Sequence, residues 1–146
     1  MQETAAARPA TRSQLLAWAG YDWANSPFFA VIVTFVFAAY FTEAVAVDTV
    51  TGTAQWGWAM TVSALVIAVL APVSGAIADA GGPRKPWLAA CTIVCAAATV
   101  GLWWVTPEPA SVPLALTLVV IAVVAAEIGQ SFYNAVLPDL APASHL

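Results

Sequence analysis

The sequence has 146 residues, of which 62% are hydrophobic and only 8% are charged, and its net charge is −4. Soluble domains carry roughly 25% charged residues, so this composition excludes an ordinary water-soluble domain and indicates an integral membrane protein. The negative charge also argues against nucleic acid as a partner, because phosphate binding requires basic patches.

Four long apolar runs follow a short polar start. Residues 1–14 are polar and small, which indicates a cytoplasmic tail, and residues 15–146 form the predicted transmembrane region. About 20 apolar residues are needed to cross a bilayer as a helix, and each run is long enough. We therefore predict an all-α membrane protein with four transmembrane helices, at residues 21–42, 56–78, 87–105 and 112–137.

The basic residues set the orientation. All four, Arg8, Arg12, Arg84 and Lys85, fall on one side of the predicted spans, whereas the loops on the other side carry only acidic charges. Basic loops stay cytoplasmic, so both termini are predicted to be cytoplasmic. The seven tryptophans lie at predicted span ends, which is typical of an aromatic belt at the membrane interfaces. We expect a multi-pass protein of a bacterial inner membrane.

Span one contains Asp22 and Asn25, and two interpretations of its start are open. In the first, Ser26 caps a helix whose first residue is Pro27, and Asp22 lies outside it in solvent. In the second, which we favour, the helix begins near Leu15 and is kinked by Pro27. Asp22 and Ser26 then share an inward face.

The turn after span two is rich in glycine and charge. Gly75 and Asp79 are four residues apart and share a helix face, and Gly75 is expected to allow a neighbouring helix to approach closely. A carboxylate at a helix C-terminus is unfavourable with the helix dipole, so Asp79 should find a partner such as Arg84 or Lys85. The alternative is an ordinary cytoplasmic turn whose charges only set topology.

Span four carries a polar stripe. Glu127, Gln130, Ser131 and Asn134 follow the i, i+3, i+4, i+7 spacing of one helix face. Glu127 lies about 16 Å from the predicted inner end, near the middle of a core ~30 Å thick. A carboxylate facing lipid is costly, so the stripe should face protein or a water-filled cavity. It is interpreted either as a substrate or proton site or as interhelical hydrogen-bonding residues.

The sequence offers little else for chemistry. Cys91 and Cys95, the two cysteines, lie four residues apart within span three and are interpreted as packing residues. We find no hydrolytic triad, phosphate-binding loop or metal-ligand set. The protein is therefore not expected to be an enzyme or to bind a metal or cofactor.

The pattern from Gly75 through Asp79 and Gly82 to Arg84 and Lys85 resembles the signature loop of the major facilitator superfamily. The resemblance is partial, because Ala80 replaces the usual arginine after the aspartate and a proline occupies a basic position. Three further stretches resemble a branch related to the vacuolar amino-acid effluxers of autophagy: Tyr21–Ser26, Pro72–Asp79 and Ser131–Leu140.

This resemblance implies a secondary transporter of a small solute such as an amino acid, with the proton as a candidate coupling ion. The family has about twelve spans built from three-helix repeats. The chain would then be an N-terminal fragment whose partners are the bilayer, the solute and the missing C-terminal helices. The alternative is a self-contained four-span protein that acts as an oligomeric small exporter or as a non-transporting subunit.

Overall fold

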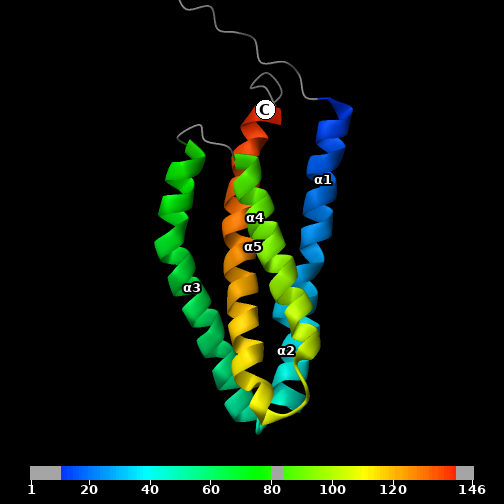
Figure 1. Ribbon diagram of the computed structural model, residues 1–146, viewed down its shortest axis with the longest axis vertical. Coiled ribbons are helices and arrows are strands. Elements are labelled where there is room, and N and C mark those ends of the chain that lie inside the picture. Colours follow the sequence, from blue (N-terminus) through cyan, green and yellow to red (C-terminus); the bar gives the residue numbers. More distant parts are fainter. Residues whose placement is uncertain (1–10, 80–83, 141–146) are drawn as a thin grey trace, which may run out of the picture.

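The computed structural model describes residues 11–79 and 84–140, and within them it is an all-α bundle (Figure 1). Four helical segments are long and apolar enough to cross a membrane, and this confirms the predicted fold class: Leu15–Val45, Thr49–Ile77, Arg84–Trp104 and Pro109–Ala135. The elements, in order, are α1 Arg12–Pro27, η1 Phe28–Phe35, α2 Val36–Tyr40, η2 Phe41–Val45, α3 Thr49–Asp79, α4 Arg84–Gly101, η3 Leu102–Trp104, η4 Pro109–Ser111 and α5 Val112–Leu140.

The first span is one composite helix. α1 ends at Pro27, and the wider π-helical segment η1 begins at the next residue. Proline has no N–H to donate to the preceding turn, which explains a change of hydrogen-bonding pattern at this point. The Ser26 hydroxyl donates to the backbone carbonyl of Asp22 at 2.8 Å, inside α1. Ser26 is therefore not a helix cap, and the interpretation in which the helix begins early and continues through Pro27 is confirmed.

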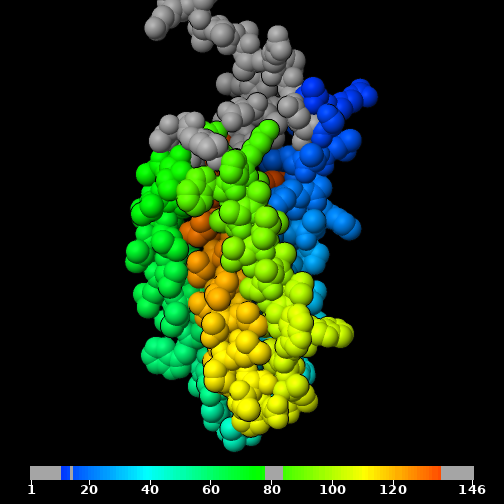
Figure 2. Space-filling view, in the orientation of Figure 1, coloured from blue at the N-terminus to red at the C-terminus, as the bar shows by residue number. Residues whose placement is uncertain are grey.

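α5 is the central helix. In its most apolar stretch 39% of the residues are buried, against 11% to 17% in the other three spans. In the space-filling view α5 is visible as a strip between α3 and α4 (Figure 2). The largest fully buried side chains, Phe41 and Phe132, belong to η2 and α5. The other three spans therefore leave most of their apolar surface exposed, as a bilayer or further helices would require.

Small residues let α4 and α5 pack closely. A Cβ added at Gly129 of α5 would lie 3.2 Å from the Cβ of Cys91 on α4, and one added at Gly101 would lie 3.0 Å from Leu118. Small residues at such contacts are typical of membrane helix packing. Among the described residues, none comes within 4 Å of a Cβ added at Gly75, so the close approach expected there stays a prediction.

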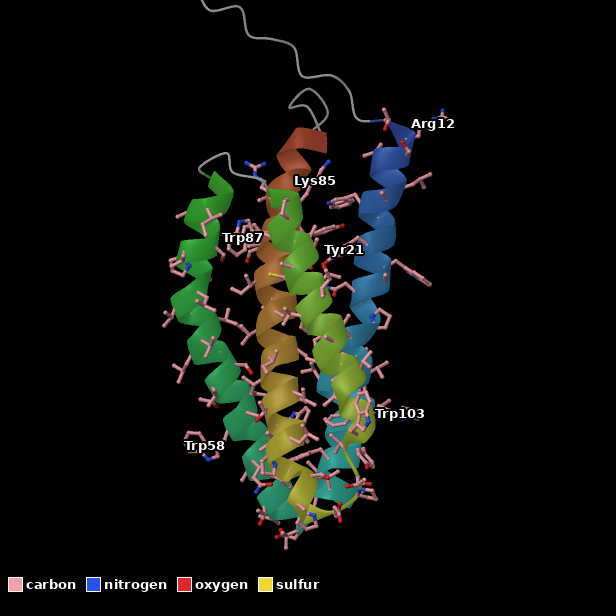
Figure 3. All side chains as sticks on the ribbon, in the orientation of Figure 1. Arg12, Tyr21, Trp58, Lys85, Trp87 and Trp103 are labelled. Atoms are coloured by element: carbon pink, nitrogen blue, oxygen red, sulfur yellow. The ribbon has the colours of Figure 1, made fainter. Side chains whose placement is uncertain are left out.

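The two ends of the bundle differ in their side chains. Arg12 and Lys85 lie toward one end, whereas Trp58 and Trp103 lie toward the other (Figure 3). Trp58 and Trp103 are highly exposed. Three other tryptophans stack on or lie against aromatic rings inside the bundle, so they are packing residues as well as belt residues: Trp18, Trp56 and Trp87.

Asp48 directly precedes α3, at the end opposite Arg12. Its carboxylate accepts one hydrogen bond from the Thr51 hydroxyl at 2.6 Å and one from the Thr51 backbone N–H at 2.9 Å. This is an N-terminal cap that satisfies a helix donor with no partner in the helix. The hydrogen bond from the Thr51 hydroxyl, together with that from its N–H, holds the pKa of Asp48 below its ordinary value.

Candidate functional site

The first and fourth spans are joined by side-chain amides at mid-length. The Asn25 Nδ2 donates to Gln130 Oε1 at 3.5 Å, and Gln130 Nε2 donates to Asn134 Oδ1 at 3.4 Å. Asn25 and Gln130 are half-buried, and Asn134 is exposed. The structure thus brings together three of the residues that the sequence singles out, from helices far apart in the chain.

The position of Asp22 follows from the contacts of its neighbours on α1. Tyr21 faces α4, because its hydroxyl lies 2.9 Å from the Thr92 hydroxyl. Successive residues of an α-helix are about 100° apart, so Asp22 and Ser26 lie on the flank of Asn25 opposite Tyr21. Both are exposed. Asp22 is therefore turned away from α4 and is not packed inside the four described spans.

The same argument places Glu127 on α5. Gly129 packs against Cys91 of α4, so that side of α5 faces α4. At about 100° per residue, Glu127 and Asn134 lie on the flank of Gln130 opposite Gly129. Glu127 is exposed, and the Ser131 hydroxyl donates to its backbone carbonyl at 3.3 Å.

These residues form one surface on the side of the α1–α5 pair that faces away from α4. We call it the polar face. The sequence-predicted stripe on α5 is thus continued by residues of α1. Its members are Asp22, Asn25, Ser26, Glu127, Gln130 and Asn134.

Glu127 lies near the middle of α5, which runs from Val112 to Leu140. Its depth in a membrane stays a prediction. Its carboxylate makes no hydrogen bond or ion pair with any residue that the structure describes. The interhelical hydrogen bonds of this surface are therefore made by the amides, and the carboxylate is left available.

Aromatic rings hold α1 to α5 next to the polar face. Trp18 stacks on Tyr133 with ring centroids 5.0 Å apart and planes 7° apart, and Tyr21 stacks on Tyr133 with centroids also 5.0 Å apart. The Tyr133 hydroxyl donates to the Trp18 carbonyl at 2.9 Å. Sequence reasoning missed these contacts, although Tyr21 and Tyr133 lie within the stretches that carry the family resemblance.

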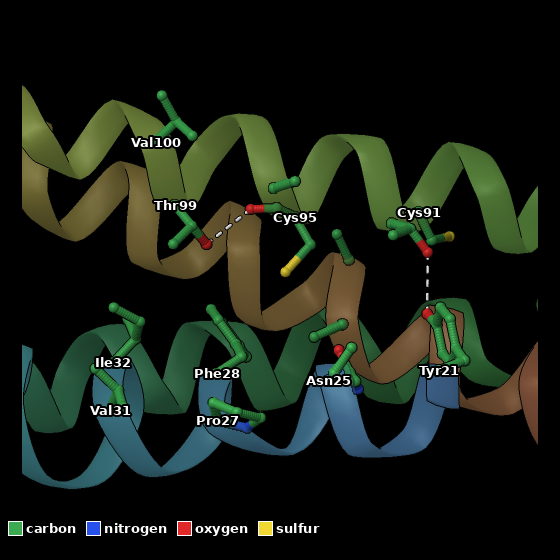
Figure 4. A pocket seen from close by; sticks show the side chains of 15 residues that line it. Tyr21, Asn25, Pro27, Phe28, Val31, Ile32, Cys91, Cys95, Thr99 and Val100 are labelled. Carbon is green, nitrogen blue, oxygen red and sulfur yellow. Dashed lines mark hydrogen bonds between the residues drawn. The ribbon is translucent and has the colours of Figure 1, made fainter. Parts of the chain in front are cut away.

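A groove lies on the side of α1 that faces α4, and Asn25 of the polar face is also part of its lining. It has a volume of about 460 Å³ and runs between α1, α4 and α5 (Figure 4). Both cysteines line it, and both are free thiols, half-buried at Cys91 and buried at Cys95. The rest of its lining is mostly apolar, so it resembles a helix-packing groove more than a polar solute site.

The turn between α3 and α4 is described only in part. Arg84 Nη1 donates to the backbone carbonyl of Ala135 on α5 at 2.8 Å, and Lys85 is exposed. Gly82 and the side chain of Asp79 lie outside the described residues, and so does the expected partner contact of Asp79. Arg84 thus links the start of α4 to the inner part of α5.

The polar face can bind protons and accept hydrogen bonds. Its groups are two carboxylates, three amides and a hydroxyl. Within residues 11–79 and 84–140, no group of three or more His, Cys, Asp or Glu side chains could hold a metal ion. The arrangement therefore fits binding of a polar solute or a proton.

Comparisons with known proteins point the same way. A family model described as vacuole effluxer Atg22 like matches residues 49–145. Over 129 residues the chain is 30% identical to a Bacillus subtilis (strain 168) protein named an uncharacterized MFS-type transporter, YxiO. That match covers 86% of this chain, and the chain spans 30% of the length of that relative. No solved structure matches the chain.

Proposed function

This chain belongs to the Atg22-like vacuole effluxer family, and from that premise we propose that it forms the amino-terminal part of a secondary transporter for a small solute. An amino acid is the proposed solute class. The observation that carries the proposal is the polar face, because uncompensated carboxylates in membrane helices are costly and usually mark a substrate or ion pathway.

The amides give the polar face its shape, and the carboxylates give it chemistry. Asn25 and Gln130 bridge α1 and α5, and the contacts of Tyr133 hold the two helices together beside them, so a solute would meet a surface that is already organised. Asn134 extends the same hydrogen-bonded row toward the inner end. We assign solute contact to Gln130 and Asn134 and proton binding to Glu127.

The remaining helices are part of the proposal. The matched relative is more than three times as long as the aligned region, so further spans are expected to cover the polar face and complete the cavity. The apolar surfaces left exposed on the described spans support this. In the complete transporter the polar face would border a central path and would not face lipid.

We further propose a gating role for the loop between α3 and α4. Arg84 binds the inner part of α5, and Asp79 ends α3 beside that loop. Motion of α3 against α5 would therefore change contacts at this end. Asp79→Asn is expected to lower transport while insertion into the membrane remains normal.

The experiment is a flux assay on the product of the whole reading frame, reconstituted in liposomes loaded with a labelled amino-acid mixture. Gln130→Leu removes both amide contacts, so efflux should fall by about tenfold or more, as the loss of a desolvated hydrogen bond predicts. Thr117→Val, an exposed site on a different flank of α5, is the matched control and should transport normally. Absence of efflux in the unaltered protein would favour a non-transporting subunit.

A further inference from the structure

The polar face is rich in acceptors and poor in cations. Lys and Arg occur only at positions 8, 12, 84 and 85, so no position in the described spans between Ser13 and Asp79, or after Lys85, can offer a cationic side chain to a solute. The face instead presents the Asp22 and Glu127 carboxylates and the amide oxygens beside them. A carboxylate of the solute would meet like charge on the polar face, which is unfavourable. Arg84 contacts the backbone carbonyl of Ala135, beside Asn134, but it belongs to α4 and is not a member of the face.

The two carboxylates lie at different depths. α1 and α5 run antiparallel, because Trp18 contacts Tyr133 whereas Asn25, further along α1, contacts Gln130, earlier on α5. Taking the contact between Asn25 and Gln130 as the reference level, Asp22 lies about 4.5 Å toward the inner end at 1.5 Å per residue. Asn134 lies about 6 Å in the same direction, and Glu127 about 4.5 Å in the opposite one.

Asp22 and Asn134 therefore share both a level and a face, and Glu127 lies about 9 Å deeper along the helix axes. This separation divides the polar face into two parts that can bind different groups at the same time. The amides of Asn25 and Gln130 lie between them and are already bonded to each other.

We propose that the inner part of the polar face, Asp22 with the Asn134 amide, binds the ammonium group of the transported solute. The proposal rests on the transport function proposed above and names the chemical class that this part recognises. An ammonium group has three donors and a positive charge, which match a carboxylate and an amide oxygen. Both groups are exposed on the described chain, so a solute can reach them.

The inner part of the polar face recognises the amine end of the solute. The amine of an amino acid is required by these spans, and the carboxylate is not. Glu127 is left for the proton, because it lies too far along the helix to contact the same ammonium group.

Three probes that share one branched carbon chain test this. Isoamylamine carries only an amine, 4-methylpentanoate carries only a carboxylate, and leucine carries both groups. Each is added as competitor to efflux of the labelled amino-acid mixture from liposomes that contain the product of the whole reading frame. Isoamylamine and leucine should compete, and 4-methylpentanoate should not. Asp22→Asn should weaken competition by isoamylamine about tenfold or more, because a charge-assisted hydrogen bond is lost.

Two further variants keep the test decisive. Asp22→Glu keeps the charge and should retain the preference for the amine, whereas Glu43→Gln removes an exposed carboxylate at the far end and should change nothing. Equal competition by 4-methylpentanoate, or an amine preference that survives in Asp22→Asn, overturns the proposal while transport stands. Absence of efflux of any labelled amino acid contradicts the transport function itself.

Discussion

The side chains of Asn25 and Gln130 meet at 3.5 Å although the two residues are 105 positions apart. This contact joins the first span to the fourth and fixes the polar face between them. On either side of it lie a carboxylate of α1 and a carboxylate of α5.

The first prediction concerns topology. Arg12 and Lys85 lie at the same end of the bundle, and basic residues stay in the cytoplasm. Alkaline phosphatase fused after Leu146 should therefore be inactive, and a green fluorescent protein fused there should fluoresce. An active alkaline phosphatase and a non-fluorescent green fluorescent protein would place residue 146 outside the cytoplasm and contradict the predicted orientation.

Asp48 should make stability depend on pH. Its folded pKa lies below the ordinary value of 3.8, because the carboxylate accepts the Thr51 hydroxyl and N–H. The carboxylate therefore stabilises α3 above that value, and the stabilisation is lost as the pH falls through the lowered pKa. In Asp48→Asn, the melting temperature measured by circular dichroism should fall less in acid than it does in the unaltered protein. Asparagine still caps the helix but does not titrate. Identical pH profiles would rule out this role.

A side chain at Gly129 should weaken the packing of α4 on α5. Val at this position would meet Cys91 at a distance where a neighbour must move, so Gly129→Val should destabilise the bundle by about 1–3 kcal/mol. Gly57→Val introduces the same side chain where a Cβ meets nothing within 4 Å and serves as the control. Unfolding in detergent mixtures measures both, and equal stabilities would mean that α4 and α5 do not pack as described.

Tyr133 joins α1 to α5 in two separable ways. Tyr133→Phe removes the hydrogen bond to the Trp18 carbonyl and should cost about 0.5–1.5 kcal/mol. Tyr133→Ala also removes the ring that stacks on Trp18 and Tyr21 and should cost more. Unfolding free energies of the two variants provide the measurement. If they are equal, the stacked rings do not stabilise the pair.

The sequence predicted the helical elements well, because they depend on local periodicity. Four apolar runs indicated four spans, and the spacing of Glu127, Gln130 and Asn134 placed them on one helix face. The start of the first helix could be decided only by the structure, since a serine followed by proline suits both a cap and a kink.

What the sequence could not supply was the register between helices. Gly75 and Gly129 look alike as residues, yet only Gly129 faces a neighbouring helix among the described residues. The same limit hid the stack of Trp18 on Tyr133, because a tryptophan at a span end also suits an interface belt. Asp22 joined the polar face only when the contacts of Tyr21 and Asn25 fixed the rotation of α1.

Glu127→Gln tests the central claim most directly, because it removes only the ability to carry a proton and keeps the shape and hydrogen-bonding capacity of the side chain. The product of the whole reading frame and this variant are reconstituted, and efflux driven by a pH gradient is measured beside solute exchange without a gradient. We predict that the variant loses gradient-driven efflux and retains exchange. Equal gradient-driven efflux in both proteins would contradict the account and leave Glu127 with a structural role only.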